Sequence, residues 1–219
     1  GCNLVDLGAA PAPVMNFALA TLADCRSGVM VTASHNPKED NGFKIIIDNQ
    51  VLSSDQILDL RDRMAEDQFT NGNGESRRLD IKEYYIEKVV EDIIPPGNLR
   101  IAIDSGNGIA GEIAPTLFRQ LGCKVTELFS QMDGDFPNHP PDPTVSANLR
   151  TLIETVRTQR LDLGLAFDGD GDRVVAVTGT GRIVWPDELL MIFARDIVAR
   201  NPGADIIYDV KSTRRLHQL

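Results

Sequence analysis

Three aspartates on alternate residues, Asp168, Asp170 and Asp172, are separated only by glycine and are followed by Arg173. Carboxylates this close repel one another unless a cation lies among them, and glycine lets the backbone curl until their oxygens converge. An EF-hand calcium loop does not fit, because the positions that need Gly and Glu hold Arg173 and Gly179. The pattern therefore predicts a divalent-metal loop, and a solvated acidic turn is the simpler alternative.

Ser34 is a second side chain that could take part in chemistry. It lies in Thr32-Ala33-Ser34-His35-Asn36-Pro37, directly after an apolar run that predicts a buried strand, so we expect it at a sheet edge where ligands bind. His35 is a poor base for it, because adjacent side chains diverge. A phosphorylated serine, however, carries about two negative charges, which a cation held by three carboxylates would neutralise while the phosphoryl group stays electrophilic. We therefore predict that both loops belong to one site.

A glycine-rich turn, Gly106-Asn107-Gly108-Ile109-Ala110-Gly111, suggests a different function. It matches G-x-G-x-x-G, follows a predicted strand and opens a predicted helix, as a dinucleotide fingerprint does, and Glu127 lies where an acidic residue would contact ribose. Against this, Asp104 and Ser105 lengthen the turn, and a nicotinamide-binding domain gives no reason for three aspartates later in the same sheet. A dinucleotide-binding oxidoreductase domain remains an alternative, beside a purely structural strand-to-helix turn.

The composition limits the partners. The chain has 22 Lys and Arg against 32 Asp and Glu, and its net charge of −10 argues against nucleic acid or an anionic membrane surface as a partner. Local cations must therefore hold any phosphorylated substrate. No apolar run approaches the ~20 residues of a membrane span and no signal segment opens the chain, so we expect a cytoplasmic protein without an obligate protein partner. Cys2, Cys25 and Cys123 are odd in number and lack metal or redox spacing, so we expect no disulfide framework and interpret them as buried or incidental thiols.

Hydrophobic periodicity and turn residues divide the first part of the chain into short alternating elements. Helices are predicted at 14–23 and from a capping box of Ser53 with Gln56 through Asp67, and strands at 3–7, 28–33 and 43–47. Residues 70–78 contain two glycines and no large apolar side chain, so we predict a linker there, with a domain boundary after residue 76.

The rest of the chain repeats a strand and helix rhythm that is typical of an α/β protein. Predicted helices lie at 81–93 (opened by Asp80 with Glu83), 109–121, 148–160, 188–200 (capped by Asp187) and from Lys211 onward. Predicted strands lie at 99–103, 124–129, 163–167, 174–177 and 206–210, and the segment 133–143 is irregular and longer than most connections. We predict successive three-layer α/β domains with mostly parallel mixed sheets, of which the first and last are incomplete.

Several motifs in a fixed order make the chain resemble the α-D-phosphohexomutase family. They are TASHNP (32–37), NGFK (41–44), GDFPNHPPDP (134–143), DGDGDR (168–173) and DVKSTRR (209–215), which together extend along nearly the whole chain. The resemblance implies that residues 1–76 are the later part of the family's first domain, 77–182 its second domain and 183–219 the beginning of the third. With no starting Met, the chain is expected to be a piece of a longer protein.

The resemblance also implies roles for individual residues. Ser34 matches the family's phosphoserine and is a metal ligand together with Asp168, Asp170 and Asp172. Lys44 matches a lysine that handles protons and stabilises phosphate. The other residues that line the catalytic cleft are His35, Asn36, Arg173 and Lys211, the last two as phosphate contacts.

The implied reaction is reversible phosphoryl transfer between C1 and C6 of a hexose phosphate, with mannose or glucose as the sugar. Mg²⁺ is the implied cofactor, and a bisphosphorylated hexose is the implied activator and intermediate. We expect the 219-residue chain alone to have little or no activity, because much of such a site would lie outside it. Phosphoglucosamine mutase activity and a non-catalytic, metal-stabilised binding domain are further alternatives.

Overall fold

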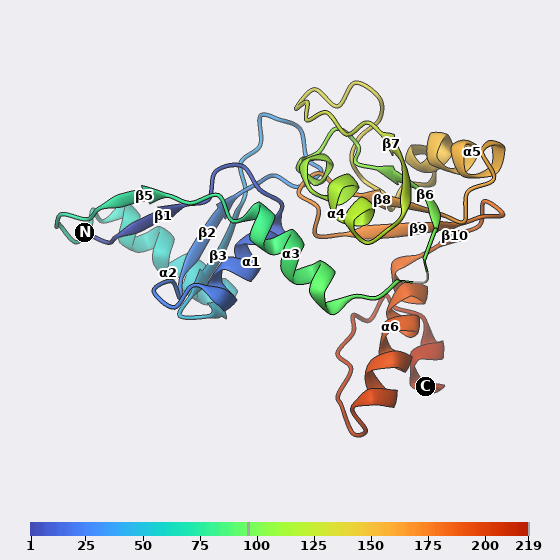
Figure 1. Ribbon diagram of the computed structural model, residues 1–219. Coiled ribbons are helices and arrows are strands. Elements are labelled where there is room, and N and C mark those ends of the chain that lie inside the picture. Colours follow the sequence, from blue (N-terminus) through green and yellow to red (C-terminus); the bar gives the residue numbers. More distant parts are fainter. Residues whose placement is uncertain (96, 219) are drawn as a thin grey trace.

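The computed structural model describes residues 1–95 and 97–218 and shows two α/β bodies connected through one helix, with a helical segment at the end (Figure 1). The first body contains β1 (Leu4–Asp6), α1 (Ala12–Thr21), β2 (Gly28–Val31), β3 (Phe43–Ile47), β4 (Gln50–Val51), α2 (Ser54–Ala65) and β5 (Ser76–Arg78). Helix α3 (Lys82–Asp92) follows it. These elements confirm the predicted α/β class.

The second body holds the larger sheet. Its elements are β6 (Arg100–Asp104), η1 (Ile109–Glu112), α4 (Ala114–Gln120), β7 (Lys124–Leu128), η2 (Ser146–Leu149), α5 (Arg150–Thr158), β8 (Leu163–Phe167), β9 (Val174–Thr178) and β10 (Ile183–Val184). The strand order is β10-β9-β8-β6-β7, with β6 parallel to β7 and β8, and β9 antiparallel to β8 and β10. The chain ends in α6 (Pro186–Arg200) and η3 (Arg214–Gln218).

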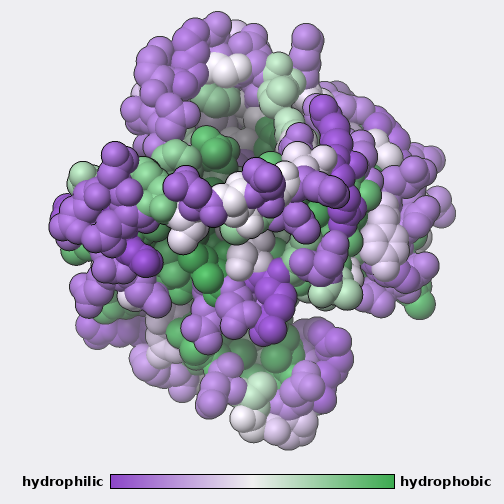
Figure 2. Space-filling view, turned by 90° about the vertical axis from the view of Figure 1, so that its left-hand side faces the viewer, coloured by the Kyte–Doolittle hydropathy of each residue, from purple (hydrophilic) through white to green (hydrophobic). Residues whose placement is uncertain are grey.

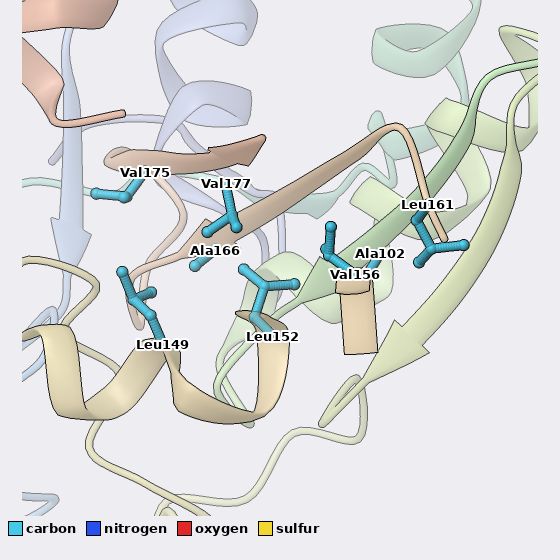
Figure 3. Close-up of a cluster of buried hydrophobic side chains, with 8 residues drawn as sticks. All are labelled: Ala102, Leu149, Leu152, Val156, Leu161, Ala166, Val175 and Val177. Atoms are coloured by element: carbon cyan, nitrogen blue, oxygen red, sulfur yellow. The ribbon is translucent and has the colours of Figure 1, made fainter. Parts of the chain in front are cut away.

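The side chains of β6 alternate between two cores, so helices cover both faces of this sheet. Ile101 and Ile103 pack with Ala114 of α4 on one face, whereas Ala102 points into a cluster with residues of α5 on the other. Figure 3 shows this second cluster, in which Leu152 and Val156 of α5 point at the sheet. The predicted three-layer arrangement follows directly from this alternation.

Gly164 in β8 lets α5 approach the sheet. A Cβ at this position would lie 2.8 Å from Val156 Cγ2 and 2.9 Å from Leu152 Cδ1, closer than packed carbons come. Because β8 carries the 168–173 loop directly after Phe167, the same close packing fixes the base of that loop.

The first body is built from two smaller sheets. β2, β3 and β4 form an antiparallel sheet, in which Met30 lies opposite Lys44, and β1 pairs with β5 in parallel. The predicted capping box is confirmed: Ser53 N donates to Gln56 Oε1 over 2.9 Å, and Gln56 N donates to Ser53 Oγ over 3.4 Å. One face of β2 and β3 is apolar and exposed, and Figure 2 shows apolar surface among polar groups on this side of the molecule.

The linker prediction for residues 70–78 is wrong at its end. Residues Ser76 to Arg78 form β5, with Leu4 opposite Ser76 and Asp6 opposite Arg78. Backbone hydrogen bonds to β1 stabilise this strand, and its three polar side chains are exposed, so no hydrophobic pattern marks it. The domain boundaries after residues 76 and 182 remain predictions, although β10, beyond the second boundary, pairs with β9.

Several helix starts differ from the prediction. The helix expected at 109–121 begins as η1 and continues as α4, in which Pro115 occupies one of the first two positions. Helix α3 was predicted to open with Asp80, but its N-cap residue is Ile81, whose side chain makes no capping hydrogen bond. Asp80 Oδ1 instead accepts a hydrogen bond from Lys82 N over 3.1 Å. Helix α6 begins at Pro186 after Trp185, because proline suits a first helical position, so Asp187 lies inside the helix.

The strand predicted at 206–210 is absent, which corrects the interpretation of the last elements. Ile207 and Val210 are 93% and 96% exposed, and no other strand in the described part of the chain pairs with this segment. An isolated apolar run lacks the partners that make a strand stable. The following helix is the short 3₁₀ turn η3. Over residues 1–95 and 97–218, no helix combines the length and the apolar character that crossing a membrane requires.

Candidate catalytic and metal site

The loop between β8 and β9 brings the three aspartates together. Phe167 pairs with Val174, so residues 168–173 are the turn of an antiparallel hairpin. The carboxylate oxygens of Asp168, Asp170 and Asp172 lie within 4.8 Å of one another. Gly171 adopts a positive φ of +72°, which allows the backbone to curl as the spacing predicted. Asp168 is 0% exposed and Asp170 4%, so two of the three carboxylates are desolvated.

Two neighbouring elements fix the backbone of this loop. Ala12 N, at the start of α1, donates to the carbonyl oxygen of Asp170 over 2.9 Å. Ile109 N, at the start of η1, donates to the carbonyl oxygen of Gly169 over 3.1 Å. The loop backbone is thus held by both bodies of the molecule.

Ser34 lies directly against the loop. Its Oγ donates to Asp168 Oδ2 over 2.7 Å, and its N donates to Thr32 Oγ1 over 2.9 Å. Thr32 Oγ1 in turn donates to Asp170 Oδ2 over 2.9 Å. Ser34 has a φ of +55°, a left-handed conformation that costs a non-glycine residue roughly 1–2 kcal/mol. The contacts around it maintain this conformation, which aims the hydroxyl at Asp168.

Arg173 contacts both the loop and Ser34. Its N donates to Asp168 Oδ1 over 3.0 Å, and its Nε donates to Asp168 Oδ2 over 2.8 Å. Nη2 also donates to Ser34 Oγ, and to His35 Nδ1 over 2.6 Å. Because a guanidinium only donates, Nδ1 of His35 is the acceptor. Arg173 therefore places fixed positive charge beside the serine hydroxyl, as a phosphate contact requires.

Lys44 balances the other two aspartates. Its Nζ lies 2.7 Å from Asp170 Oδ2 and 2.5 Å from Asp172 Oδ2. Burial alone would lower the pKa of Lys44, but the hydrogen bonds to both carboxylates raise it. Burial would likewise raise the pKa of Asp170, yet hydrogen bonds from Lys44 and Thr32 lower it. These contacts therefore favour an ionised Asp170 and a charged Lys44.

The donor set fits a divalent cation. Asp170 Oδ1 is buried and has no hydrogen-bond partner among the described residues, so one carboxylate oxygen is left for a ligand. Lys44 and Arg173 neutralise only two of the three carboxylate charges. Hard oxygen donors with excess negative charge are what Mg²⁺ prefers in proteins. The residues that would hold it are Asp168, Asp170 and Asp172.

Comparison with known families agrees with this geometry. Residues 1–71 match the family model described as phosphoglucomutase/phosphomannomutase, alpha/beta/alpha domain I, and residues 83–181 match the model of alpha/beta/alpha domain II. The chain belongs to the phosphohexomutase family. The resemblance stated from its motifs is therefore confirmed.

Individual phosphohexomutases are similar to nearly the whole chain. The phosphomannomutase/phosphoglucomutase of Pseudomonas aeruginosa is 50% identical over 216 residues, which are 99% of this chain and 46% of that protein. The phosphoglucomutase of Neisseria meningitidis is 43% identical over 219 residues, which cover 99% of this chain and 47% of the length of that protein. A crystal structure of a phosphoglucomutase/phosphomannomutase family protein from Burkholderia thailandensis gives a TM-score of 0.94 at 43% identity, over 99% of this chain and 49% of that one. The chain spans about half the length of these relatives.

Two predicted site residues of this phosphohexomutase chain are not joined to the cluster. Asn36 is exposed, and its N donates to the carbonyl oxygen of Ala33 over 2.9 Å. The side chain of Lys211 is 84% exposed, and its Nζ lies 3.5 Å from Asp209 Oδ2. Lys211 follows the segment that does not form the expected strand, so no sheet edge positions it. The roles of both residues remain predictions.

Thr32 and Asp142 belong to the site but were missed from the sequence. Thr32 links Ser34 to Asp170, and its place two residues before the serine in the same motif was the available signal. Burial would raise the pKa of Asp142, but hydrogen bonds from Thr144 and the positive charge of Arg173 lower it. Asp142 lies in the irregular segment 133–143, which its length and the GDFPNHPPDP motif marked as functional without singling out this residue.

The glycine-rich turn of this phosphohexomutase has a structural task. A Cβ on Gly108 would lie 2.6 Å from the carbonyl oxygen of Gly169, and a Cβ on Gly111 would lie 2.0 Å from that of Ser130. A Cβ on Gly106 would lie 3.1 Å from Pro141 Cβ. Protein atoms therefore cover the surface that a pyrophosphate would need, and Glu127 accepts from Arg119. The geometry does not support the dinucleotide alternative.

Proposed function

We propose that the chain carries the phosphoserine and metal loops of an enzyme that moves a phosphoryl group between C1 and C6 of a hexose phosphate, with mannose or glucose as the sugar. The observation that carries the proposal is the hydrogen bond from Ser34 Oγ to Asp168 Oδ2, 2.7 Å long. It joins a nucleophile to a carboxylate cluster that fits a divalent cation. Neither loop would supply both parts by itself.

The chemistry consists of two balanced transfers. In the first, the bond between phosphorus and phospho-Ser34 Oγ breaks while a free hydroxyl oxygen of the sugar bonds to phosphorus. The sugar hydroxyl loses its proton, Ser34 regains one, and a bisphosphorylated hexose forms. After this intermediate reorients, Ser34 Oγ attacks the other phosphoryl group and the reverse exchange restores the phosphoserine. Positioning and charge stabilisation supply most of the acceleration in such transfers.

The residues around Ser34 have distinct tasks in this scheme. Asp168 accepts a hydrogen bond from the Ser34 hydroxyl and so orients Oγ for attack. Arg173, beside the same hydroxyl, holds the phosphoryl oxygens in place. A cation held by the three aspartates would supply Lewis-acid charge neutralisation. We assign proton transfer or oxyanion stabilisation to Lys44, because its ammonium group contacts two aspartates of the loop and is still partly exposed to a ligand.

Replacement of the nucleophile tests the proposal. Ser34→Ala, in a polypeptide extended to the length of the relatives, is expected to abolish turnover of hexose 1-phosphate activated by a hexose bisphosphate. Ser27→Ala is a matched control, because Ser27 lies before β2 and the contact of its Oγ among the described residues is the hydrogen bond that it accepts from Asp48 N over 3.1 Å. Near-normal turnover in Ser34→Ala would sink the proposal.

Two alternatives predict other results. A non-catalytic, metal-stabilised domain would bind Mg²⁺ without forming a phosphoserine. A phosphoglucosamine mutase would form the phosphoserine but turn over glucosamine phosphate faster than mannose or glucose phosphate. Comparing the three sugar phosphates with the same enzyme separates these cases, and no described contact of this chain favours glucosamine. We expect the 219-residue chain alone to turn over none of them appreciably.

A further inference from the structure

We propose that His139 and Asp104 form a buried ion pair that positions the catalytic loops, by holding the irregular segment 133–143 against the metal loop. This inference rests on the proposed function, because it names a residue that supports the same site. His139 touches neither Ser34 nor an aspartate of the loop among its described contacts. It is therefore a positioning residue and not a catalytic one.

The ion pair is well defined. His139 Nε2 lies 3.2 Å from Asp104 Oδ1 and 3.1 Å from Oδ2, and Nδ1 lies 2.8 Å from the carbonyl oxygen of Pro140. A carboxylate and a carbonyl both accept, so both ring nitrogens must donate, which only an imidazolium can do. Asp104, at the end of β6, is 1% exposed and also accepts from Gly106 N over 2.9 Å. The charge on His139 thus compensates a buried carboxylate.

The described contacts of His139 come from three sides. Asp104 is the titratable group that faces it from β6, and the Phe129 ring, after β7, packs edge-on at 5.3 Å. On its own segment the contact is with the Pro140 carbonyl. The protonation of His139 is accordingly governed by Asp104 and by burial.

Pro141 transmits this anchor to the metal loop. It is fully buried between two glycines that lack the side chains to keep it away. A Cβ on Gly106 would lie 3.1 Å from Pro141 Cβ and 3.5 Å from His139 Cε1, and a Cβ on Gly169 would lie 3.4 Å from Pro141 Cγ. Gly169 belongs to the Asp168–Arg173 loop. His139 therefore fixes a proline that packs directly on the backbone between two proposed metal ligands.

Further contacts tie the same segment to the glycine-rich turn and to the Ser34 loop. Asn138 Nδ2 donates to Asn107 Oδ1 over 2.8 Å, which fastens the segment to the glycine-rich turn. At its other end, Asp135 accepts from Lys38, four residues after Ser34. Asp142 follows Pro141 and lies within electrostatic range of Arg173. A neutral imidazole keeps only one N–H, so loss of the imidazolium would cost either the bond to Asp104 or the bond to the Pro140 carbonyl, and would leave the buried Asp104 without its counter-charge. We expect this loss to loosen the whole arrangement.

The unmodified chain tests the inference without a variant. The Mn²⁺ dissociation constant is measured by water-proton relaxation from pH 5.5 to 9, and the His139 ring is followed by NMR over the same range. We expect Mn²⁺ binding to weaken by about tenfold as the His139 signal reports deprotonation, the loss typical of a disturbed supporting contact. An affinity that stays constant through the His139 titration overturns the inference.

A variant series separates His139 from other titrating groups. In His139→Gln we expect Mn²⁺ to bind about tenfold more weakly, and we expect its affinity no longer to change with pH as it does in the parent. His217→Gln, on η3, is the matched control and should keep both the Mn²⁺ affinity and the pH dependence of the parent. Asp104→Asn should lose as much Mn²⁺ affinity as His139→Gln does. The double variant should bind Mn²⁺ only slightly more weakly than either single variant, because the two residues act as one unit. If His139→Gln folds and keeps the Mn²⁺ affinity and pH profile of the parent, the proposed role of the His139–Asp104 ion pair is contradicted. If the variant does not fold, the pH titration of the unmodified chain is the deciding test.

Failure of the inference and failure of the proposed function give different results. Asp170→Asn removes a proposed metal ligand and is expected to abolish Mn²⁺ binding. If Asp170→Asn binds Mn²⁺ like the parent, the metal loop itself is wrongly assigned, and the inference falls with it. If Asp170→Asn loses binding while folded His139→Gln does not, only the role of the ion pair is wrong.

Discussion

Ser34 Oγ donates a hydrogen bond to Asp168 Oδ2 over 2.7 Å, although 134 positions separate the two residues in the sequence. Ser34 follows β2 in the first body, and Asp168 follows β8 in the second, so the contact exists only because the two bodies pack together. Arg173 and Thr32 reinforce it from either side. Changes that move one loop by an ångström should therefore affect both nucleophile and metal site.

Gly169→Ala tests how tightly the two loops must approach. A Cβ at Gly169 would lie 2.0 Å from the carbonyl oxygen of Ser34, so one backbone must move. We expect the free energy of unfolding to fall by about 1–3 kcal/mol and phosphoryl transfer at Ser34 to be lost. Urea unfolding measures the first effect. Gly97→Ala is the control, because a Cβ there meets nothing within 4 Å; equal stability of the two variants would contradict the close approach.

Lys44→Gln should change metal binding and catalysis in opposite directions. Its ammonium group occupies oxygens of Asp170 and Asp172 that a cation would also use, so we expect Mn²⁺ to bind several-fold more tightly to the variant. Phosphoryl transfer should fall by about 10²-fold or more, because proton handling or oxyanion stabilisation is lost. Titration calorimetry and a turnover assay check the two effects. A variant that binds metal more weakly and transfers normally would show that Lys44 is part of the metal site alone.

The stability of the fold should depend on the charge of His139. The hydrogen bond to Asp104 raises the pKa of His139, against the opposing effect of burial. A folded pKa above the unfolded value of about 6.5 means that this stabilisation is complete below pH 6.5 and is lost as pH rises through the folded pKa. Thermal unfolding midpoints should therefore fall over that window in the parent and stay flatter in His139→Gln. Parallel pH profiles for the two proteins would refute this dependence.

Local patterns predicted the site better than they predicted the ends of the fold. The apolar run between Asp162 and Asp168 predicted β8 with its bounds, and with it the loop that it carries. The alternation of β6 shows why the sheet is covered on both faces. The sequence does not predict β5, because its polar residues form a strand only through backbone hydrogen bonds to β1. The strand predicted at 206–210 is wrong, because an apolar run also needs a neighbouring strand, and the propensity of the run does not show whether one is there.

The site itself was only partly readable from the sequence. Alternate aspartates imply a cation by repulsion alone, so Asp168, Asp170 and Asp172 were identified as a cluster at once. Joining them to Ser34 needed either a charge argument or the family resemblance. Thr32 and Asp142 are ordinary residue types in ordinary places, and only the folded structure brings Thr32 into contact with Asp170 and Asp142 within electrostatic range of Arg173. The dinucleotide alternative failed for the same reason, because the sequence does not show that Pro141 and Gly169 cover the glycines.

The most direct test of the central claim is the mass of the protein after incubation with a hexose 1,6-bisphosphate and Mg²⁺. We predict an increase of about 80 Da, one phosphoryl group, which peptide mapping assigns to Ser34 and which is absent from Ser34→Ala. The polypeptide should be extended to the length of the relatives, since the chain spans about half of them. No phosphoryl group on Ser34, in a protein that turns over hexose phosphate, would contradict the account.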